Sequence, residues 1–239
     1  MKKLISNLLF IMLSTQLLSQ SSIEIKVGGN LSYRLLSGKE IFNETIELRN
    51  ENESAKILPS LGLTFKKNIS PKSHLGVGVQ FTKLGYVLVQ YDDARWPDEI
   101  VNGQYMPHDT LDGFKMRFTE IYLEIPLMYE YRLLERTKWN IDFGVGISPA
   151  YILNGRNYIF SDREGDSEWP INYESGNYNR FQMPLTAHFQ MNYSVSDKLY
   201  LLSSIGGAFH LTGYFKGINI VERFCRVGVY VGLGLRLNS

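Results

Sequence analysis

Residues 120–132 decide the fold, and they read Glu-Ile-Tyr-Leu-Glu-Ile-Pro-Leu-Met-Tyr-Glu-Tyr-Arg. Every second residue from Ile121 to Tyr131 is apolar or aromatic, whereas the residues between them repeatedly carry carboxylates, as at Glu120 and Glu124. A period of two puts successive side chains on opposite faces, which predicts a β-strand and not a helix. The strand is longer than most strands of globular proteins, and its length suits a strand that crosses a bilayer at a tilt.

The start of the chain differs from the rest. Lys2 and Lys3 precede an interrupted apolar run, Leu4–Leu18, and small or polar residues follow that run. This order of segments is typical of a secretory signal peptide, so we expect a signal peptide at 1–20 and a single β-barrel domain at 21–239. An N-terminal anchor helix is the alternative interpretation.

Composition narrows the class of the exported domain. The net charge of +1 gives no reason to expect nucleic acid as a partner, and the 13% of aromatic residues favours strands. With Cys225 as its one cysteine, the chain cannot form an intramolecular disulfide. After the leader, no apolar run is long enough for a transmembrane helix. A β-barrel can still span a membrane with such a composition, because only alternate residues of its strands need to be apolar.

Other stretches of the chain repeat the two-residue period of 120–132. Their ranges are 23–35, 57–65, 75–91, 139–151, 181–193, 199–211 and 227–237. The connections are alternately short and long, and the long ones are 38–54, 92–112, 154–177 and 215–221. An even number of strands with short turns on one side and long loops on the other is typical of outer-membrane barrels. The sequence therefore predicts an all-β fold, an eight-stranded antiparallel transmembrane β-barrel.

Lipid tolerates no open sheet edge, so the first strand is expected to pair with the last. Both termini are then expected on the short-turn, periplasmic side. Aromatic residues on the apolar face lie near both strand ends, as at Tyr129 and Trp139 on one side and Tyr33 and Tyr151 on the other. Such belts are typical of the two membrane–water boundaries. A soluble β-sandwich, the alternative, has no need of aromatic belts at both ends.

The polar faces of the strands are expected to line a narrow lumen, because they are rich in glycine and carry both signs of charge. The expected lumen charges are Glu24, Lys26, Arg34, Lys56, Glu120, Glu124, Glu130, Asp142, Arg180, Arg226 and Arg236. A buried carboxylate without a partner is costly. We therefore expect Glu124 to have a basic partner, and the candidates are Arg226, Arg180 and Lys26.

One irregularity interrupts this pattern. Phe114 and Phe118 are apolar although they share the parity of Glu120 and Glu124. Either a β-bulge near 117–120 switches the two faces, or the strand extends beyond the membrane, where the parity rule does not apply. The sequence does not decide between these alternatives.

The segment Tyr-Leu-Glu-Ile-Pro-Leu at 122–127, followed by Tyr129 and Tyr131, resembles a recurring strand of the small outer-membrane β-barrel proteins of Bacteroidota, which include the PorT-like proteins. The glycine-alternating last strand, Gly228–Leu237, is similar to that group as well. The resemblance implies a location in the cell outer membrane. For PorT-like proteins it also implies an association with type IX protein secretion.

The sequence predicts no catalytic, cofactor-binding or metal-binding residues. His74, His188 and His210 fall on the lumen face, whereas Ser203 falls on the lipid face, so that serine has no histidine beside it. Ser148 and His188 could form a pair in the lumen, although a structural role in hydrogen bonding is the simpler interpretation.

The long loops and the cysteine offer weaker candidates. Acidic residues of one loop could gather a calcium ion, but their spacing matches no complete EF-hand; they are Asp162, Glu164, Asp166 and Glu168. Trp96 and Trp169 could anchor a partner or a glycan, or pack the loops together. His108 lies in a loop, and Cys225 faces lipid by parity.

An eight-stranded barrel is too narrow for an open channel once side chains fill it. We therefore expect an integral outer-membrane protein with a filled polar lumen, which has a structural or partner-binding role and is not an enzyme. Its expected partners are membrane lipid and an envelope or secretion-system protein at the long loops. A PorT-like accessory of type IX secretion and a lipid-modifying enzyme are the alternatives.

Overall fold

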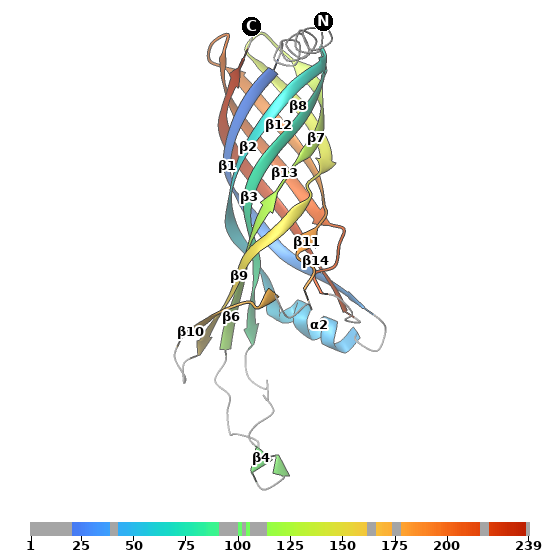
Figure 1. The fold of residues 1–239 in the computed structure, drawn as a ribbon, viewed down its shortest axis with the longest axis vertical. Coiled ribbons are helices and arrows are strands. Elements are labelled where there is room, and N and C mark those ends of the chain that lie inside the picture. The colour runs from blue at the N-terminus through green and yellow to red at the C-terminus, as the bar shows by residue number, and fades with distance from the viewer. Residues whose placement is uncertain are drawn as a thin grey trace, which may run out of the picture.

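The computed structural model describes residues 21–38, 43–90, 100–101, 104–105, 114–161, 166–173, 178–215 and 220–237. Its body is a tall barrel of tilted strands, with the short turns at one end and the long connections at the other (Figure 1). The expected signal peptide, His108 and Trp96 lie outside the described residues. Within the described residues, the structure contains no helix long and apolar enough to cross a membrane.

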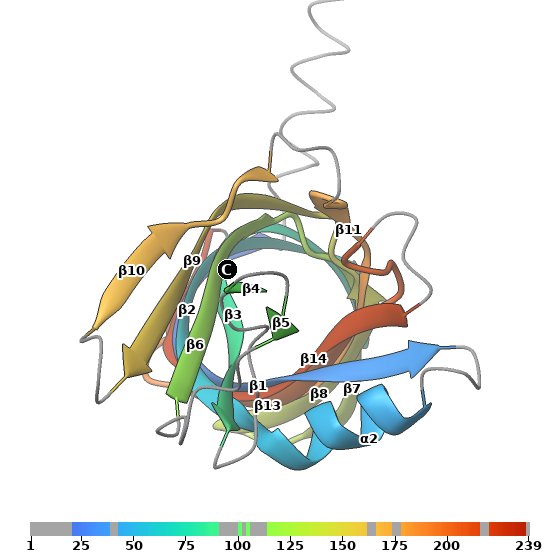
Figure 2. The same cartoon turned by 90° about the horizontal axis from the view of Figure 1, so that it is seen from below.

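Eight strands hydrogen-bond in a closed ring (Figure 2). In spatial order they are β3 (Ser73–Gln90), β2 (Glu53–Ser70), β1 (Ser21–Gly38), β14 (Ile220–Arg236), β13 (Leu199–His210), β12 (Pro184–Ser194), β8 (Trp139–Ile147) and β7 (Leu127–Glu135). Strand β7 pairs back with β3, and every pairing is antiparallel. The predicted pairing of the first strand with the last is confirmed, because β1 and β14 pair from Ser22–Arg236 to Gly38–Ile220.

The sheet continues past the ring toward the long connections. There β6 (Phe114–Glu124) pairs with β3 and with β9 (Ala150–Ser161). Strand β9 in turn pairs with β10 (Ser167–Pro170) and with β11 (Phe181–Gln182). Strands β4 (Ile100–Val101) and β5 (Gln104–Tyr105) form a separate small hairpin. On the loop side, the sheet therefore extends beyond the ring of eight strands.

Prolines divide three neighbouring strands of the predicted barrel. Pro126 separates β6 from β7, Pro149 lies between β8 and β9, and Pro184 begins β12 after β11. Proline has no N–H to give to the ladder, but its carbonyl can still accept. The bonds that it accepts are Gly78 N–Pro126 O at 3.0 Å, Ile125 N–Pro149 O at 2.8 Å and Ser148 N–Pro184 O at 2.9 Å. Hydrogen bonding thus continues from strand to strand across all three breaks.

Exposure separates the two faces as predicted. On the outside, Val229 is 58% exposed and Phe189 is 51% exposed, whereas Glu24 and Glu124 on the inside are each 1% exposed. A barrel with an apolar outside and an ionic inside is suited to lipid. Cys225 also follows its predicted parity, but it is buried between its cross-strand neighbours on β1 and β13.

The expected polar loop at 38–54 contains a helix, α2 (Asn43–Asn52). The helix lies beside the outer ends of β1 and β2 (Figure 1). It has no apolar stripe that could have predicted it. Its tie to the barrel is ionic instead, because Arg49 forms ion pairs with Glu53, four residues later, and with Glu222 of β14.

The irregularity at Phe114 and Phe118, in β6, is resolved in favour of an extension of the strand. Phe118, Glu120 and Tyr122 are all buried on the inner face, and the β3–β6 register is unbroken from Gln90–Phe114 to Gln80–Glu124. Of the two alternatives, the bulge near 117–120 is therefore wrong. The register shifts in the pairing with β9 instead, where Leu153 is the extra residue.

Replacing Val229 by arginine tests the assignment of the outer face. Val229 lies in the middle of β14, opposite Gly29 and Ile205. We expect Val229→Arg to reduce the free energy of unfolding in phospholipid vesicles by about 2–4 kcal/mol, because the guanidinium would enter the centre of the bilayer. Val229→Ala serves as the control for lost volume. Equal losses in both variants would contradict a lipid-facing Val229.

Candidate functional site

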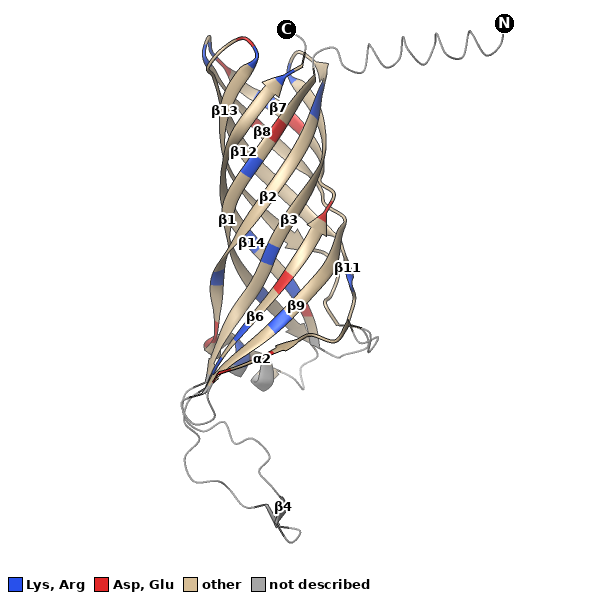
Figure 3. Cartoon of the chain, turned by 60° about the vertical axis from the view of Figure 1, so that its left-hand side comes forward, with Lys and Arg blue, Asp and Glu red and all other residues tan. Residues whose placement is uncertain are grey.

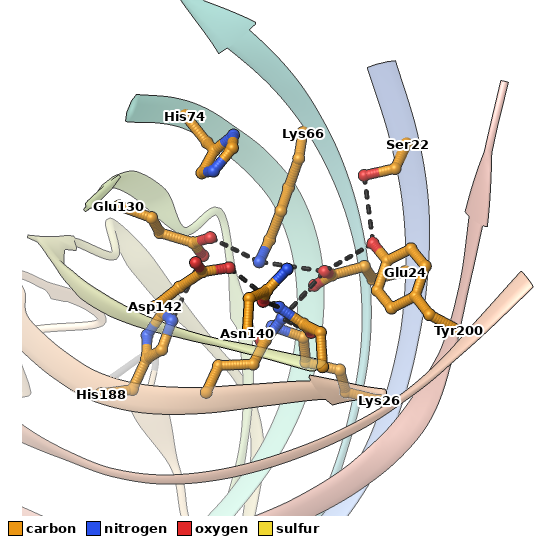
Figure 4. Close-up of polar contacts among 12 residues, drawn as sticks. Ser22, Glu24, Lys26, Lys66, His74, Glu130, Asn140, Asp142, His188 and Tyr200 are labelled. Carbon is orange, nitrogen blue, oxygen red and sulfur yellow. Dashed lines mark hydrogen bonds and ion pairs between the residues drawn. The ribbon is translucent and has the colours of Figure 1, made fainter. Parts of the chain in front are cut away.

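A network of charged and polar side chains fills the turn-side half of the lumen (Figure 4). Glu24 lies at its centre, where Lys26 and Lys66 each place a Nζ atom 3.0 Å from the carboxylate. Tyr200 and Gln190 also donate hydrogen bonds to Glu24, of 2.8 Å and 2.9 Å. A carboxylate with 1% exposure thus has two cations and two neutral donors, which compensate its loss of water.

Lys66 connects this group to the opposite wall. Its Nζ atom lies 2.5 Å from Glu130 of β7, and His188 Nε2 of β12 lies 3.2 Å from the same carboxylate. Glu24 and Glu130 therefore share one lysine across the lumen. The network therefore crosses the lumen from β1 and β2 to β7 and β12.

Two glycines make room for these contacts. A Cβ atom at Gly144 would lie 2.6 Å from the His188 ring and 3.0 Å from the Glu130 side chain. A Cβ atom at Gly234 would lie 2.0 Å from the Tyr200 ring. The glycines on the polar faces of the strands thus leave space into which larger side chains of neighbouring strands project.

A cavity of about 140 Å³ opens beside the network at the turn-side end. Asp142 lies in its wall, where it accepts a 2.8 Å hydrogen bond from Asn192 and has Arg132 at 3.3 Å. Arg132 also lies 3.3 Å from His74. Every charge named at this mouth has a partner of opposite charge or a hydrogen-bond partner, so the cavity is polar without an uncompensated charge.

Glu124 has the basic partner that its burial requires. The two terminal guanidinium nitrogens of Arg226, Nη1 and Nη2, both contact it, and the bond from Nη2 to Oε2 is 2.6 Å. Of the three expected candidates, Arg226 is therefore confirmed. Arg180 is not a partner, because it donates to the Ile152 carbonyl at 3.0 Å and stacks over the outward Tyr151 ring. Arg180 lies before β11, outside the regular alternation, and its guanidinium also lies 5.4 Å from the centroid of the Tyr173 ring.

An apolar plug fills the loop-side half of the lumen. We use this name for the buried cluster of Leu84, Tyr86, Phe118, Tyr122, Ala150, Ile152, Ile171, Tyr214 and Phe224. Phe118 stacks on Tyr86 with ring centroids 4.9 Å apart, and Tyr214 meets Phe118 edge to face at 5.8 Å. Ile171 and Tyr214 come from the long connections, which fold inward over the end of the barrel.

Glu120 is buried within this plug and receives three phenol hydrogen bonds. Tyr122 and Tyr214 donate at 2.5 Å, and Tyr173 is the third donor. Burial raises the pKa of Tyr173, and the Glu120 carboxylate raises it further, so this loop phenol stays protonated as a donor. No ion pair includes Glu120 within the described part of the chain. Tyrosines take the place that cations occupy around Glu24.

The outer end of the lumen carries an ionic clasp, formed by Arg34 of β1, Arg49 of α2, Glu53 of β2 and Glu222 of β14. Arg34 contacts both carboxylates, and its distance to Glu222 is 2.5 Å. Arg49 contacts both as well, at 3.2 Å to Glu53 and 2.9 Å to Glu222. The clasp joins the first strand to the last and holds α2 against them.

The residues considered for chemistry do not assemble into a catalytic group. Ser148 lies opposite Pro184, so four strand positions, or about 13 Å, separate it from His188. His74, His188 and His210 are in the lumen as predicted, whereas Ser203 is exposed on the outer face. The described residues contain no group of acidic, histidine or cysteine side chains suited to a metal ion. Of the acidic loop, Asp162 and Glu164 lie outside the described residues, and Glu168 pairs with Arg156.

Removing Arg226 tests whether Glu124 depends on it. We expect Arg226→Met to reduce the free energy of unfolding by about 3–5 kcal/mol, because it leaves a buried carboxylate without its cation. The double variant Glu124→Leu/Arg226→Met should recover most of that loss. Denaturant titrations in vesicles measure both. A double variant as unstable as the single one would contradict the proposed pairing.

Tyr214→Phe tests the phenols around Glu120. It removes one donor to a buried carboxylate and keeps the ring, so the free energy of unfolding should fall by about 1–3 kcal/mol. Tyr178→Phe is the matched control, because the Tyr178 ring lies 5.3 Å from that of Tyr214 and no hydrogen bond of its hydroxyl occurs among the described residues. Comparable losses in the two variants would assign the effect to packing.

The chain has a distant similarity to several proteins of solved structure. Solved structures with a similar arrangement include neisserial surface protein A (10% identity, 90% of this chain and 96% of that one, TM-score 0.42). Another is OprG from Pseudomonas aeruginosa, with 10% identity over 92% of this chain and 97% of that one and a TM-score of 0.44. A third is the outer membrane protease OmpT from Escherichia coli, with 9% identity over 91% of this chain and 97% of that one and a TM-score of 0.45. At this level of similarity, the function of none of them transfers to this chain.

No curated protein matches the chain in sequence. The family described as the outer membrane protein beta-barrel domain matches residues 16–222, which is most of the chain. With the closed ring, the lipid-facing exterior and this match, the chain belongs to the outer membrane protein beta-barrel domain family.

Proposed function

We propose that this protein is a closed outer-membrane barrel that does not conduct solutes and that serves as a structural or partner-binding element of the envelope. The observation that carries the proposal is the filled lumen. The ionic network crosses the turn-side half, and the apolar plug closes the loop-side half. A general porin needs a continuous aqueous passage.

The remaining space inside the barrel is divided. Besides the cavity of about 140 Å³ there is a second one of about 80 Å³, and Glu130 lines both. At about 10–15 Å³ for each water, the two cavities hold on the order of ten and six water molecules. Because Glu130 is fixed between Lys66 and His188, it forms part of the wall between the two cavities. This arrangement supports a structural interior.

The loop end is the surface proposed for a partner, and the short-turn end with both termini is proposed to face the periplasm. At the loop end, α2, β10 and the extended strands β6 and β9 project past the ring. Trp169 of β10 is 39% exposed there. Exposed aromatic side chains are frequent anchors of protein interfaces.

Planar-bilayer recordings test the closed lumen. The purified protein should give no stable ohmic channel, because ion pairs and packed rings occupy the cross-section at two levels. A porin that is inserted under the same conditions provides the positive control. A steady conductance that scales with salt would overturn the proposal of a closed barrel.

Photo-crosslinking in intact cells tests the partner-binding face. A crosslinking residue at Glu47 on α2 or at Trp169 should capture a specific envelope protein, whereas the same residue at Asp197 in a short turn should not. A captured component of the type IX secretion machinery would support the PorT-like role that the sequence resemblance implies. Equal capture from both ends would count against a binding face at the loops.

A further inference from the structure

Basic side chains gather on the outside of the barrel at the loop-side end of the lipid-facing surface. We call Lys56, Lys83, Lys115 and Arg117 the outer basic cluster. On β3, Lys83 follows a column of exposed apolar residues, which are Leu75, Val77, Val79 and Phe81. Figure 3 shows basic positions on the neighbouring strands β3, β6 and β9 in this part of the barrel.

The cluster is organised around Thr119 of β6. Lys56 Nζ donates a 2.5 Å hydrogen bond to Thr119 Oγ1. Thr119 pairs with Gly85, and Lys83 lies two residues before Gly85 on the same face. Arg117 lies two residues before Thr119, which is about 7 Å along the strand. Lys56 thus contacts this hydroxyl group directly, and the strand positions of Lys83 and Arg117 lie within two residues of it.

Lys56 belongs to the outside, although the alternation of β2 places it in the lumen. The β2–β3 register shifts between Ala55 and Ser60, so the alternation is interrupted at Lys56. Its contact, Thr119, lies on the outer face of β6, because Phe118 and Glu120 on either side point inward. The prediction of a lumen position for Lys56 was therefore wrong.

Among the residues that the structure describes, no acidic side chain pairs with the positive charges of the cluster. The positive charges of Arg117 and Lys83 lie close enough to Lys56 to repel it. The contrast is Arg156 on the next strand, which pairs with Glu168. Like charges held together without a counter-charge favour an anionic ligand.

The height of the cluster limits what that anion can be. The outward residues from Ile121 to Tyr131 extend over about 33 Å of strand, which is about 25 Å across the membrane at the usual tilt. This is the thickness of the apolar band of such barrels. Lys83 pairs with Ile121, so it lies at the upper edge of the band. The cluster therefore lies at the level of the lipid head groups on the loop side.

We propose that the outer basic cluster binds the phosphate groups of a phosphorylated glycolipid in the leaflet beside the loops, with the acyl chains against Phe81 and the apolar column below it. Arginine and lysine from different strands can contact one phosphate together, and arginine can do so through two nitrogens. The choice of the glycolipid over a glycerophospholipid rests on the proposed orientation, with the loops outside the cell.

Binding of lipid A by the purified full-length protein in detergent micelles tests the site. The test variant is Lys56→Gln/Lys83→Gln/Arg117→Gln. The control variant, Lys72→Gln/Lys138→Gln/Lys198→Gln, removes the same charge from exposed turns at the other end. We expect diphosphoryl lipid A to bind the test variant about tenfold or more weakly than the wild-type protein, the equivalent of one charge-assisted hydrogen bond. The control variant should bind like the wild type.

A second measurement needs no variant. The wild-type protein should bind diphosphoryl lipid A more tightly than lipid A without phosphates, and more tightly than phosphatidylglycerol. Equal affinity for the three lipids would overturn the proposal, and so would equal losses in the two variants. The shift in gel mobility on boiling shows whether each variant is folded. If lipid A binding fails these tests, the proposal of a non-conducting barrel still stands. If the barrel conducts ions but binds lipid A as expected, only the proposed function is rejected.

Discussion

The pairing of β1 with β14 is the interaction on which the rest of this structure depends. In lipid no water can satisfy the N–H and C=O groups of a free strand edge, so the sheet must close on itself. Closure with eight strands fixes a narrow interior, and a narrow interior fixes which side chains can occupy it. The glycines at 144 and 234 follow from this constraint, since the rings of His188 and Tyr200 occupy the space that a Cβ atom would need.

The interior meets the cost of burying charge in two different ways. Around Glu24 and Glu130 the compensation is ionic, with Lys66 between the two carboxylates. Around Glu120 it consists of phenol donors inside an aromatic cluster. Ionic compensation lies toward the turns, phenolic compensation lies within the apolar plug, and the ionic clasp lies beyond the plug at the outer end. The two halves of the lumen thus differ in chemistry although the same strands build both.

Much of this architecture follows from the period of two in the sequence, because the parity of a residue within its strand decides whether its side chain faces lipid or the lumen. Parity also places Arg226 within reach of Glu124, although it does not distinguish Arg226 from Lys26. It fails where the ladder is irregular. Lys56 lies at a register shift, where Pro59 interrupts the pairing of β2 with β3, and Arg180 lies before a short strand, so parity does not predict the contacts of either side chain. Helix α2 escapes prediction for another reason, since ion pairs to distant residues hold it and no apolar stripe does.

The ionic clasp has a consequence for the order of folding. Arg34 and Glu222 are 188 positions apart in the chain, so their contact has one of the largest sequence separations in the molecule. Contacts of such separation form late, because the chain between them must first be brought together. The clasp therefore cannot exist in a partly assembled sheet, and helix α2 gains its final tie only once the last strand is in place. The position of α2 reports whether the ring is complete.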